Sequence, residues 1–122
     1  MNKKILIVED EQSLRRALVE KMSTEGFEII EAGDGEEGLK AALQNKPDLI
    51  LLDIVMPKMD GITMLGKLRE SEWGKNANVL ILTNLSSGAE LINAIEKNSY
   101  EYLAKTDWKL EEIAEKVKNM LK

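Results

Sequence analysis

An apolar run that ends in two acids, Ile5-Leu6-Ile7-Val8-Glu9-Asp10, introduces a pattern that returns further along the chain. Leu49-Ile50-Leu51-Leu52 ends in Asp53, and Val79-Leu80-Ile81-Leu82 ends in Thr83. Short runs that are apolar throughout are typical of strands that are covered on both faces, as in a parallel sheet. The carboxyl ends of such strands line one edge of the sheet, where ligands bind. We therefore expect the polar residues that end these runs to lie together.

Five strand-like runs alternate with helical patterns over the 122 residues of the chain. The predicted strands cover 4–9, 28–32, 48–53, 78–83 and 100–104. Between and after them, apolar residues recur at the spacing of a helix, including a stretch near 87–97 and a last helix over 110–121. This alternation predicts right-handed crossovers and a parallel sheet with helices on both faces. We expect an α/β three-layer sandwich that forms one domain over residues 1–122.

Single residues mark the ends of these elements. Gly26 follows the first predicted helix, where a C′ glycine is common. Asp34 precedes the second helix as an N-cap, and Asp107 is in a position to cap the last one. Glu28 and Glu31 flank the apolar pair of the second strand, which places that strand at an edge of the sheet.

The composition limits the classes of function. The chain has no cysteine and no histidine, which excludes a disulfide framework, thiolate chemistry and the usual zinc ligands. Its net charge of −5 argues against direct binding to nucleic acid, which favours a basic face. The apolar runs are too short to span a bilayer. The apolar stretch after the basic start ends quickly in acids, so we expect no signal peptide. We expect a cytoplasmic protein that binds neither nucleic acid nor a membrane directly.

The acids at the strand ends predict a metal site. Glu9, Asp10 and Asp53 would repel one another, and each would raise the others' pKa unless a positive charge compensates. Mg²⁺ prefers oxygen ligands and is often held by one or two carboxylates and a phosphate. Lys105 after the fifth strand would add an ammonium group, and Thr83 a hydroxyl. Each acid alone is better explained as a helix cap or a solvated loop residue, but the whole set predicts a site for Mg²⁺ and a phosphoryl group.

With these residues, and with Met56-Pro57 shortly after Asp53, the chain closely resembles the receiver domain of bacterial two-component response regulators over essentially its whole length. The resemblance implies a flavodoxin-like three-layer sandwich with five helices and a five-stranded parallel sheet in the order 2-1-3-4-5. It also implies a signalling switch and not an enzyme in the usual sense, since a receiver catalyses only its own phosphorylation and dephosphorylation.

The resemblance assigns the acceptor and the metal ligands. Asp53 would be phosphorylated by a phosphohistidine, carried by a sensor histidine kinase or a histidine phosphotransfer protein. Asp10, Asp53 and the backbone carbonyl of Val55 would bind Mg²⁺ directly. Glu9 would act through a water molecule on the metal.

The resemblance also assigns a switch. Lys105 and Thr83 would contact the phosphate, and Tyr102 would move with Thr83. Tyr102 also has a purely structural interpretation, as a half-buried residue that packs in the last strand. The movement would change the face built from the helix near 87–97, the fifth strand and the last helix, which an effector protein downstream would read. The chain would be a monomer or a dimer that depends on phosphorylation.

Three other interpretations fit the sequence less well. Gly33-Asp34-Gly35-Glu36-Glu37-Gly38 matches the dinucleotide-binding pattern G-x-G-x-x-G, but its acids would repel a pyrophosphate, so a turn and a helix start are favoured. Phosphatases that form an aspartyl phosphate often have a second acid two residues after the nucleophile, where this chain has Val55. A receiver-like adaptor that is never phosphorylated would not need the complete set of acids, threonine and lysine, and Mg²⁺ binding would distinguish the two.

Overall fold

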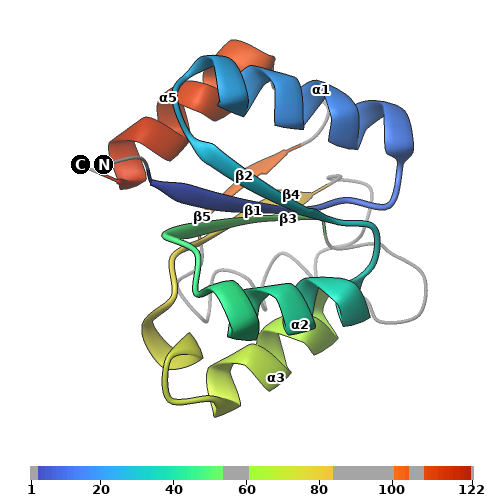
Figure 1. Cartoon of the computed structure of the whole chain (residues 1–122), viewed down its shortest axis with the longest axis vertical. Helices are drawn as coiled ribbons and strands as arrows, with labels where there is room; N and C mark the ends of the chain where they lie inside the picture. Colours follow the sequence, from blue (N-terminus) through green and yellow to red (C-terminus); the bar gives the residue numbers. More distant parts are fainter. Residues whose placement is uncertain (1–2, 54–60, 84–100, 105–108, 122) are drawn as a thin grey trace.

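The computed structural model describes residues 3–53, 61–83, 101–104 and 109–121. The strands are β1 (Lys4–Val8), β2 (Glu28–Ala32), β3 (Leu49–Asp53), β4 (Val79–Thr83) and β5 (Glu101–Ala104). The helices are α1 (Gln12–Thr24), α2 (Gly35–Asn45), α3 (Gly61–Glu70) and α5 (Leu110–Met120), and a 3₁₀ turn η1 (Gly74–Asn76) precedes β4. The sheet lies between two layers of helices (Figure 1).

The strands form one parallel sheet in the order β2-β1-β3-β4-β5. This is the predicted order, with β2 at an edge, and the predicted strand ends agree with the structure to within one residue. The flavodoxin-like α/β class is therefore confirmed. The helix predicted near 87–97 lies outside the described residues, so the number of five helices stays a prediction, as does the extent of the domain over 1–122.

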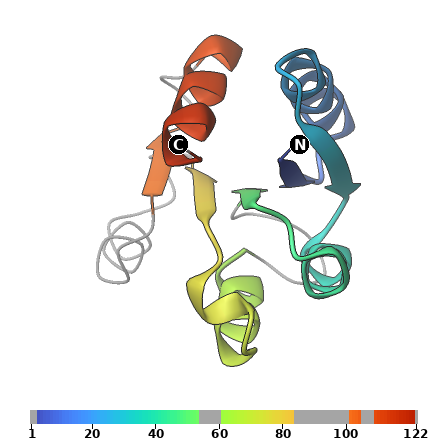
Figure 2. The ribbon, with the colours of Figure 1, turned by 60° about the vertical axis from the view of Figure 1, so that its left-hand side comes forward.

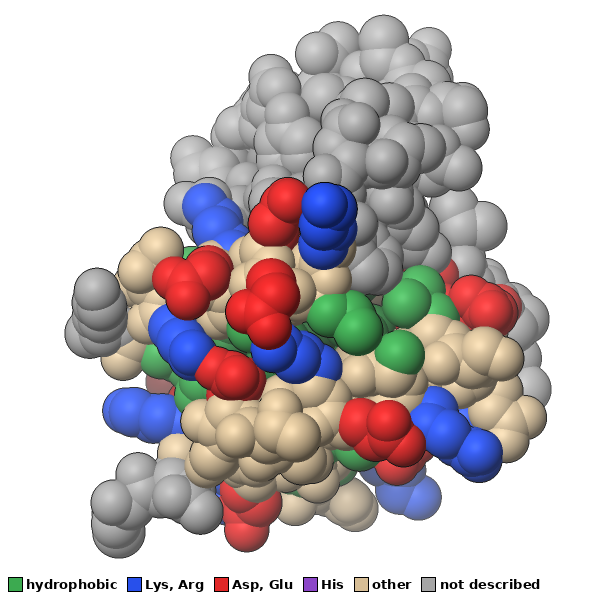
Figure 3. Space-filling view, turned by 90° about the horizontal axis from the view of Figure 1, so that it is seen from above, with side chains coloured by type: hydrophobic (Ala, Val, Ile, Leu, Met, Phe, Trp, Pro, Cys, Tyr) green, Lys and Arg blue, Asp and Glu red, His purple; other side chains and the backbone are tan. Residues whose placement is uncertain are grey.

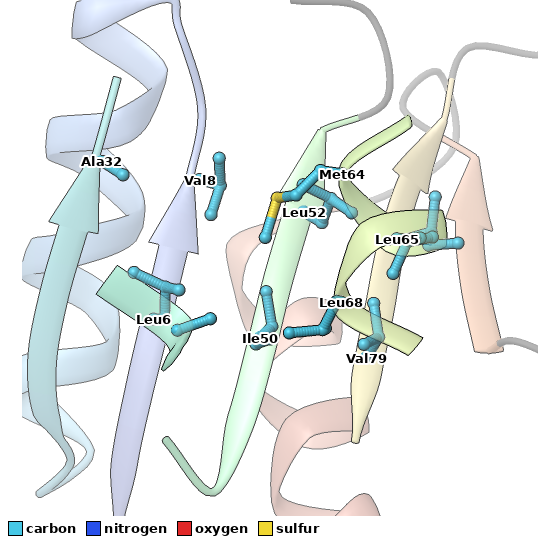
Figure 4. Close-up of a cluster of buried hydrophobic side chains, with 11 residues drawn as sticks. Leu6, Val8, Ala32, Ile50, Leu52, Met64, Leu65, Leu68 and Val79 are labelled. Carbon is cyan, nitrogen blue, oxygen red and sulfur yellow. The ribbon is translucent and has the colours of Figure 1, made fainter. Parts of the chain in front are cut away.

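Strands β1 and β3 are apolar at nearly every position because both of their faces are buried. The side chains that pack with α2 and α3 are Leu6, Val8, Ile50 and Leu52. Those that pack with α1 and α5 are Ile5, Ile7, Leu49 and Leu51. Figure 2 shows the two pairs of helices on opposite sides of the sheet, and Figure 4 shows Met64 and Leu68 of α3 packed over β3. Alternation along each strand thus divides the apolar side chains between two cores.

Of the three residues predicted to mark the beginning or end of a helix, two are confirmed and one is wrong. Gly26 follows α1 with φ +94°, a left-handed conformation that glycine adopts without strain. Asp34 is the N-cap of α2, and its carboxylate accepts a hydrogen bond from the backbone N–H of Glu37 at 2.8 Å. The prediction for α5 is wrong, because its N-cap position is taken by Lys109 and not by Asp107.

Ion pairs join α1 to α5 on one face of the molecule. Lys21 of α1 pairs with Glu25, the C-cap residue of that helix, at 3.6 Å, and with Glu111 on α5. Lys118 on α5 pairs with Glu25 in turn. The hydrogen bond from Lys118 holds the pKa of Glu25 below its ordinary value, and the hydrogen bond to Glu111 holds the pKa of Lys21 above its own. Acidic and basic side chains accordingly lie interleaved on this face (Figure 3).

Among the described helices, none combines the length and the apolar composition needed to cross a membrane.

Candidate functional site

Three of the predicted site residues meet at the carboxyl edge of the sheet. Val8 lies opposite Leu52 in the parallel register of β1 and β3, so the next residues along, Glu9 and Asp53, are neighbours. Asp10 follows directly. One carboxylate oxygen from each of the three acids lies within 4.8 Å of the others. The acid cluster predicted from the sequence is therefore formed.

The acid cluster is partly enclosed. Glu9 is 1% exposed and Asp53 is 4% exposed, whereas Asp10 faces solvent. Burying two carboxylates beside a third is costly unless opposite charge or hydrogen bonds compensate. Glu9 has part of that compensation, since its Oε2 accepts a hydrogen bond from the backbone N–H of Glu11 at 3.1 Å. A divalent cation fits this donor set, because it prefers oxygen ligands and its charge would offset the repulsion.

The backbone of Glu9 is held on both sides. Its N–H donates to the carbonyl of Ala32 in β2 at 3.1 Å. Its carbonyl accepts a hydrogen bond from Nη1 of Arg15 at 2.9 Å, and Nε of Arg15 donates to Glu31 at 3.0 Å. Arg15 was not identified from the sequence, where nothing distinguishes it from Arg16 beside it.

The remaining predicted residues are only partly described. Thr83 is the last residue of β4 and lies opposite Ala104, the last residue of β5. The backbone of Tyr102 lies in β5 opposite Ile81. The side chains of Thr83 and Tyr102, and all of Val55 and Lys105, lie outside the described part of the structure. Their roles stay predictions.

The G-x-G-x-x-G pattern has a structural explanation. Asp34 caps α2, and Glu37 Oε2 accepts a hydrogen bond from the N–H of Gly33 at 3.0 Å. Gly38 packs so closely on β1 that a Cβ built there would lie 2.8 Å from a methyl carbon of Val8. The interpretation as a turn and a helix start is confirmed, and the third glycine allows close contact between helix and strand.

Known proteins share both the sequence and the fold. The family model of the response regulator receiver domain matches residues 5–118. The alkaline phosphatase synthesis transcriptional regulatory protein PhoP of Bacillus subtilis is 39% identical over 105 residues, which are 86% of this chain and 43% of that protein. The chain thus spans less than half the length of this relative.

Two solved structures show how closely the folds agree. The receiver domain of the Francisella response regulator 1452 is 30% identical, with a TM-score of 0.83 over 98% of this chain and 97% of that one. The chemotaxis protein CheY4 of Vibrio cholerae is 25% identical, with a TM-score of 0.88 over 99% of this chain and 100% of that one. The chain therefore belongs to the family of response regulator receiver domains, which are signalling switches and not classical enzymes.

Proposed function

We propose that this chain is the phosphoacceptor switch of a two-component system. Asp53 accepts a phosphoryl group from a phosphohistidine on a sensor histidine kinase or a histidine phosphotransfer protein. The observation that carries the proposal is the convergence of Glu9, Asp10 and Asp53 at the ends of β1 and β3, in a chain that belongs to the receiver family.

The proposed step needs positioning and charge neutralisation more than covalent help from the protein. A carboxylate oxygen of Asp53 attacks phosphorus, the bond between phosphorus and the histidine nitrogen breaks, and that nitrogen keeps the electron pair. The product is an acyl phosphate on Asp53. The burial of Asp53 at the end of a central strand restricts the directions from which its oxygens can react, which favours attack in one orientation.

The acid cluster makes the step dependent on a cation. A phosphoryl group that approaches three carboxylates is repelled by all of them. Asp10, Asp53 and the carbonyl of Val55 would hold Mg²⁺ directly, and Glu9 would hold it through water. When bound, Mg²⁺ would neutralise charge on the phosphoryl oxygens.

We extend the proposal to the switch. Lys105 and Thr83 contact the phosphate, and Tyr102 follows Thr83. These movements change the face that includes β5 and α5, which an effector protein reads in the cytoplasm, with the chain as a monomer or as a dimer formed on phosphorylation. Phosphorylation adds charge and acceptor oxygens at one point, and such a change biases elements that have two stable arrangements.

An intact-mass measurement tests the acceptor. The protein is incubated with Mg²⁺ and acetyl phosphate, with Asp53→Asn as the test variant and Asp48→Asn as its matched control. Asp48 is exposed, lies just before the opposite end of β3 and accepts a hydrogen bond from the N–H of Lys4 at 2.7 Å. We expect the wild type and Asp48→Asn to gain one phosphoryl group, and Asp53→Asn or a sample with chelator to gain none.

Two results would contradict the proposal. A phosphoryl gain in Asp53→Asn would place the acceptor elsewhere. No gain in a folded wild type, with Mg²⁺ present, would favour the adaptor that is never phosphorylated.

A further inference from the structure

A side chain outside the acid cluster holds the peptide that joins two of the cluster's members. Nη1 of Arg15 donates a hydrogen bond to the carbonyl oxygen of Glu9 at 2.9 Å. That carbonyl belongs to the peptide bond between Glu9 and Asp10, and both of these carboxylates belong to the cluster. The orientation of this peptide plane determines where the backbone nitrogen and Cα of Asp10 lie. Arg15 therefore restricts the position of Asp10 relative to Glu9.

Arg15 is itself held in place. Its Nε donates to Glu31 Oε1 at 3.0 Å, and its side chain is 21% exposed. It passes so close to Gly33 that a Cβ built there would lie 3.1 Å from Nη1. The planar guanidinium group donates in two directions at once from a fixed fork, which the single ammonium of a lysine does not reproduce. The end of β1, α1 and β2 are thereby joined through one side chain.

We propose that Arg15 is a positioning residue for the cation site, and this inference rests on the proposed function. Arg15 keeps the Glu9–Asp10 peptide in the orientation at which both carboxylates converge with Asp53 before a cation binds. Groups that hold metal ligands in place from outside the ligand set typically change metal affinity by about 10- to 100-fold when they are removed. Arg15 does not itself bind the cation, and it acts only through the position of the acids that do.

The charge of Arg15 would have the opposite effect, which makes the test decisive. A guanidinium group near the cluster repels an incoming cation, and Glu31 offsets this only in part. If charge were the main effect of Arg15, its removal would tighten Mg²⁺ binding. If positioning is the main effect, its removal weakens binding.

The experiment measures the affinity of the full chain for Mg²⁺ alone by titration calorimetry. Arg15→Ala is compared with Arg16→Ala, which removes the same charge from an exposed neighbour on α1. We expect Arg15→Ala to weaken Mg²⁺ binding by about tenfold or more and Arg16→Ala to leave it nearly unchanged. Arg15→Lys keeps the charge without the fork and is also expected to bind Mg²⁺ more weakly. In phosphorylation by acetyl phosphate, Arg15→Ala should raise the Mg²⁺ concentration for half-maximal rate while the rate at saturating Mg²⁺ stays close to that of the wild type.

Several outcomes would overturn the inference. Binding of Mg²⁺ by Arg15→Ala that is as tight as in the wild type, or tighter, contradicts it, and so does an equal loss in Arg16→Ala. If circular dichroism shows that Arg15→Ala does not fold, Arg15→Lys carries the test, and an unchanged affinity in that variant overturns the inference. If the wild type binds no Mg²⁺, the metal site of the proposed function is contradicted, and the role of Arg15 fails with it. If the wild type binds Mg²⁺ and Arg15→Ala binds it with the same affinity, only the role of Arg15 is contradicted.

Discussion

Substitution of Gly38 by alanine tests the contact between α2 and β1. A Cβ at this position would lie 2.8 and 2.9 Å from the two methyl carbons of Val8 and 3.2 Å from the sulfur of Met64. Val8 is 1% exposed, and a β-branched side chain has little freedom to rotate out of the way. The helix or the strand must therefore shift to accept the methyl group.

The expected magnitude follows from two opposing effects. Alanine in place of glycine inside a helix normally stabilises by about 1 kcal/mol. Overpacking a well-packed core costs about 1–3 kcal/mol, and contacts below 3 Å with a stiff neighbour belong in the upper part of that range. We expect Gly38→Ala to lower the free energy of unfolding by about 1–2 kcal/mol overall.

Gly66 offers a matched control in the interior of α3. No described atom lies within 4 Å of a Cβ built at Gly66, and the residue is exposed. Gly66→Ala should therefore raise the free energy of unfolding by about 0.5–1 kcal/mol. Urea unfolding followed by far-UV circular dichroism should give a lower midpoint for Gly38→Ala and a higher one for Gly66→Ala. A Gly38→Ala variant at least as stable as the wild type would refute the argument from packing.

Three further changes have expected outcomes. Asp34→Ala removes the N-cap of α2 and should cost about 1 kcal/mol in urea unfolding; an unchanged midpoint would contradict this. Gly74→Ala places a Cβ in steric overlap with the backbone oxygen of Leu68 and should cost about 3 kcal/mol or more, so a fully stable variant would refute this close approach. The pKa of Glu25 is lowered mainly by its hydrogen bond with Lys118. The contribution of ionised Glu25 to folding stability is therefore present above its ordinary pKa of 4.5 and is lost as the pH falls through the lowered pKa. Glu25→Gln should thus be less stable than the wild type at neutral pH, and a difference that persists in acid would contradict the assignment.

Much of the fold could be predicted because local and global signals agree. The runs that form β1 and β3 are apolar at odd and even positions alike. Only a strand that is buried on both faces requires this pattern. The positive φ of Gly26 and the cap by Asp34 depend on neighbouring backbone groups, and such features are visible in sequence. The acid cluster could be predicted for the same reason, since parallel strands bring their carboxyl ends to one edge.

The rest depends on distances that a sequence does not contain. The contact of Arg15 with the carbonyl of Glu9 depends on how α1 is oriented against β1. Arg16 has the same side chain but does not make that contact. The pair between Lys21 and Glu111 joins residues 90 positions apart. The start of α5 at Leu110 was predicted correctly, but its N-cap was assigned wrongly to Asp107. The residue at that position, Lys109, makes no capping hydrogen bond with its side chain, so this helix start follows tertiary packing rather than a local signal.

The apolar faces of β1 and β3 have a consequence for how the strands find their alignment. In a sheet with one wet face, a slip of one residue would expose apolar side chains, and that cost specifies the register. Here a slip would only exchange one apolar set for another between the two cores. A slip of β1 or β3 toward the amino edge of the sheet would instead take Glu9 or Asp53 out of the acid cluster and place it among apolar side chains, which is costly for a carboxylate. The acids that end these strands therefore oppose such a slip. An apolar residue in place of Asp53 would remove the proposed metal ligand and would also lower the cost of this misalignment.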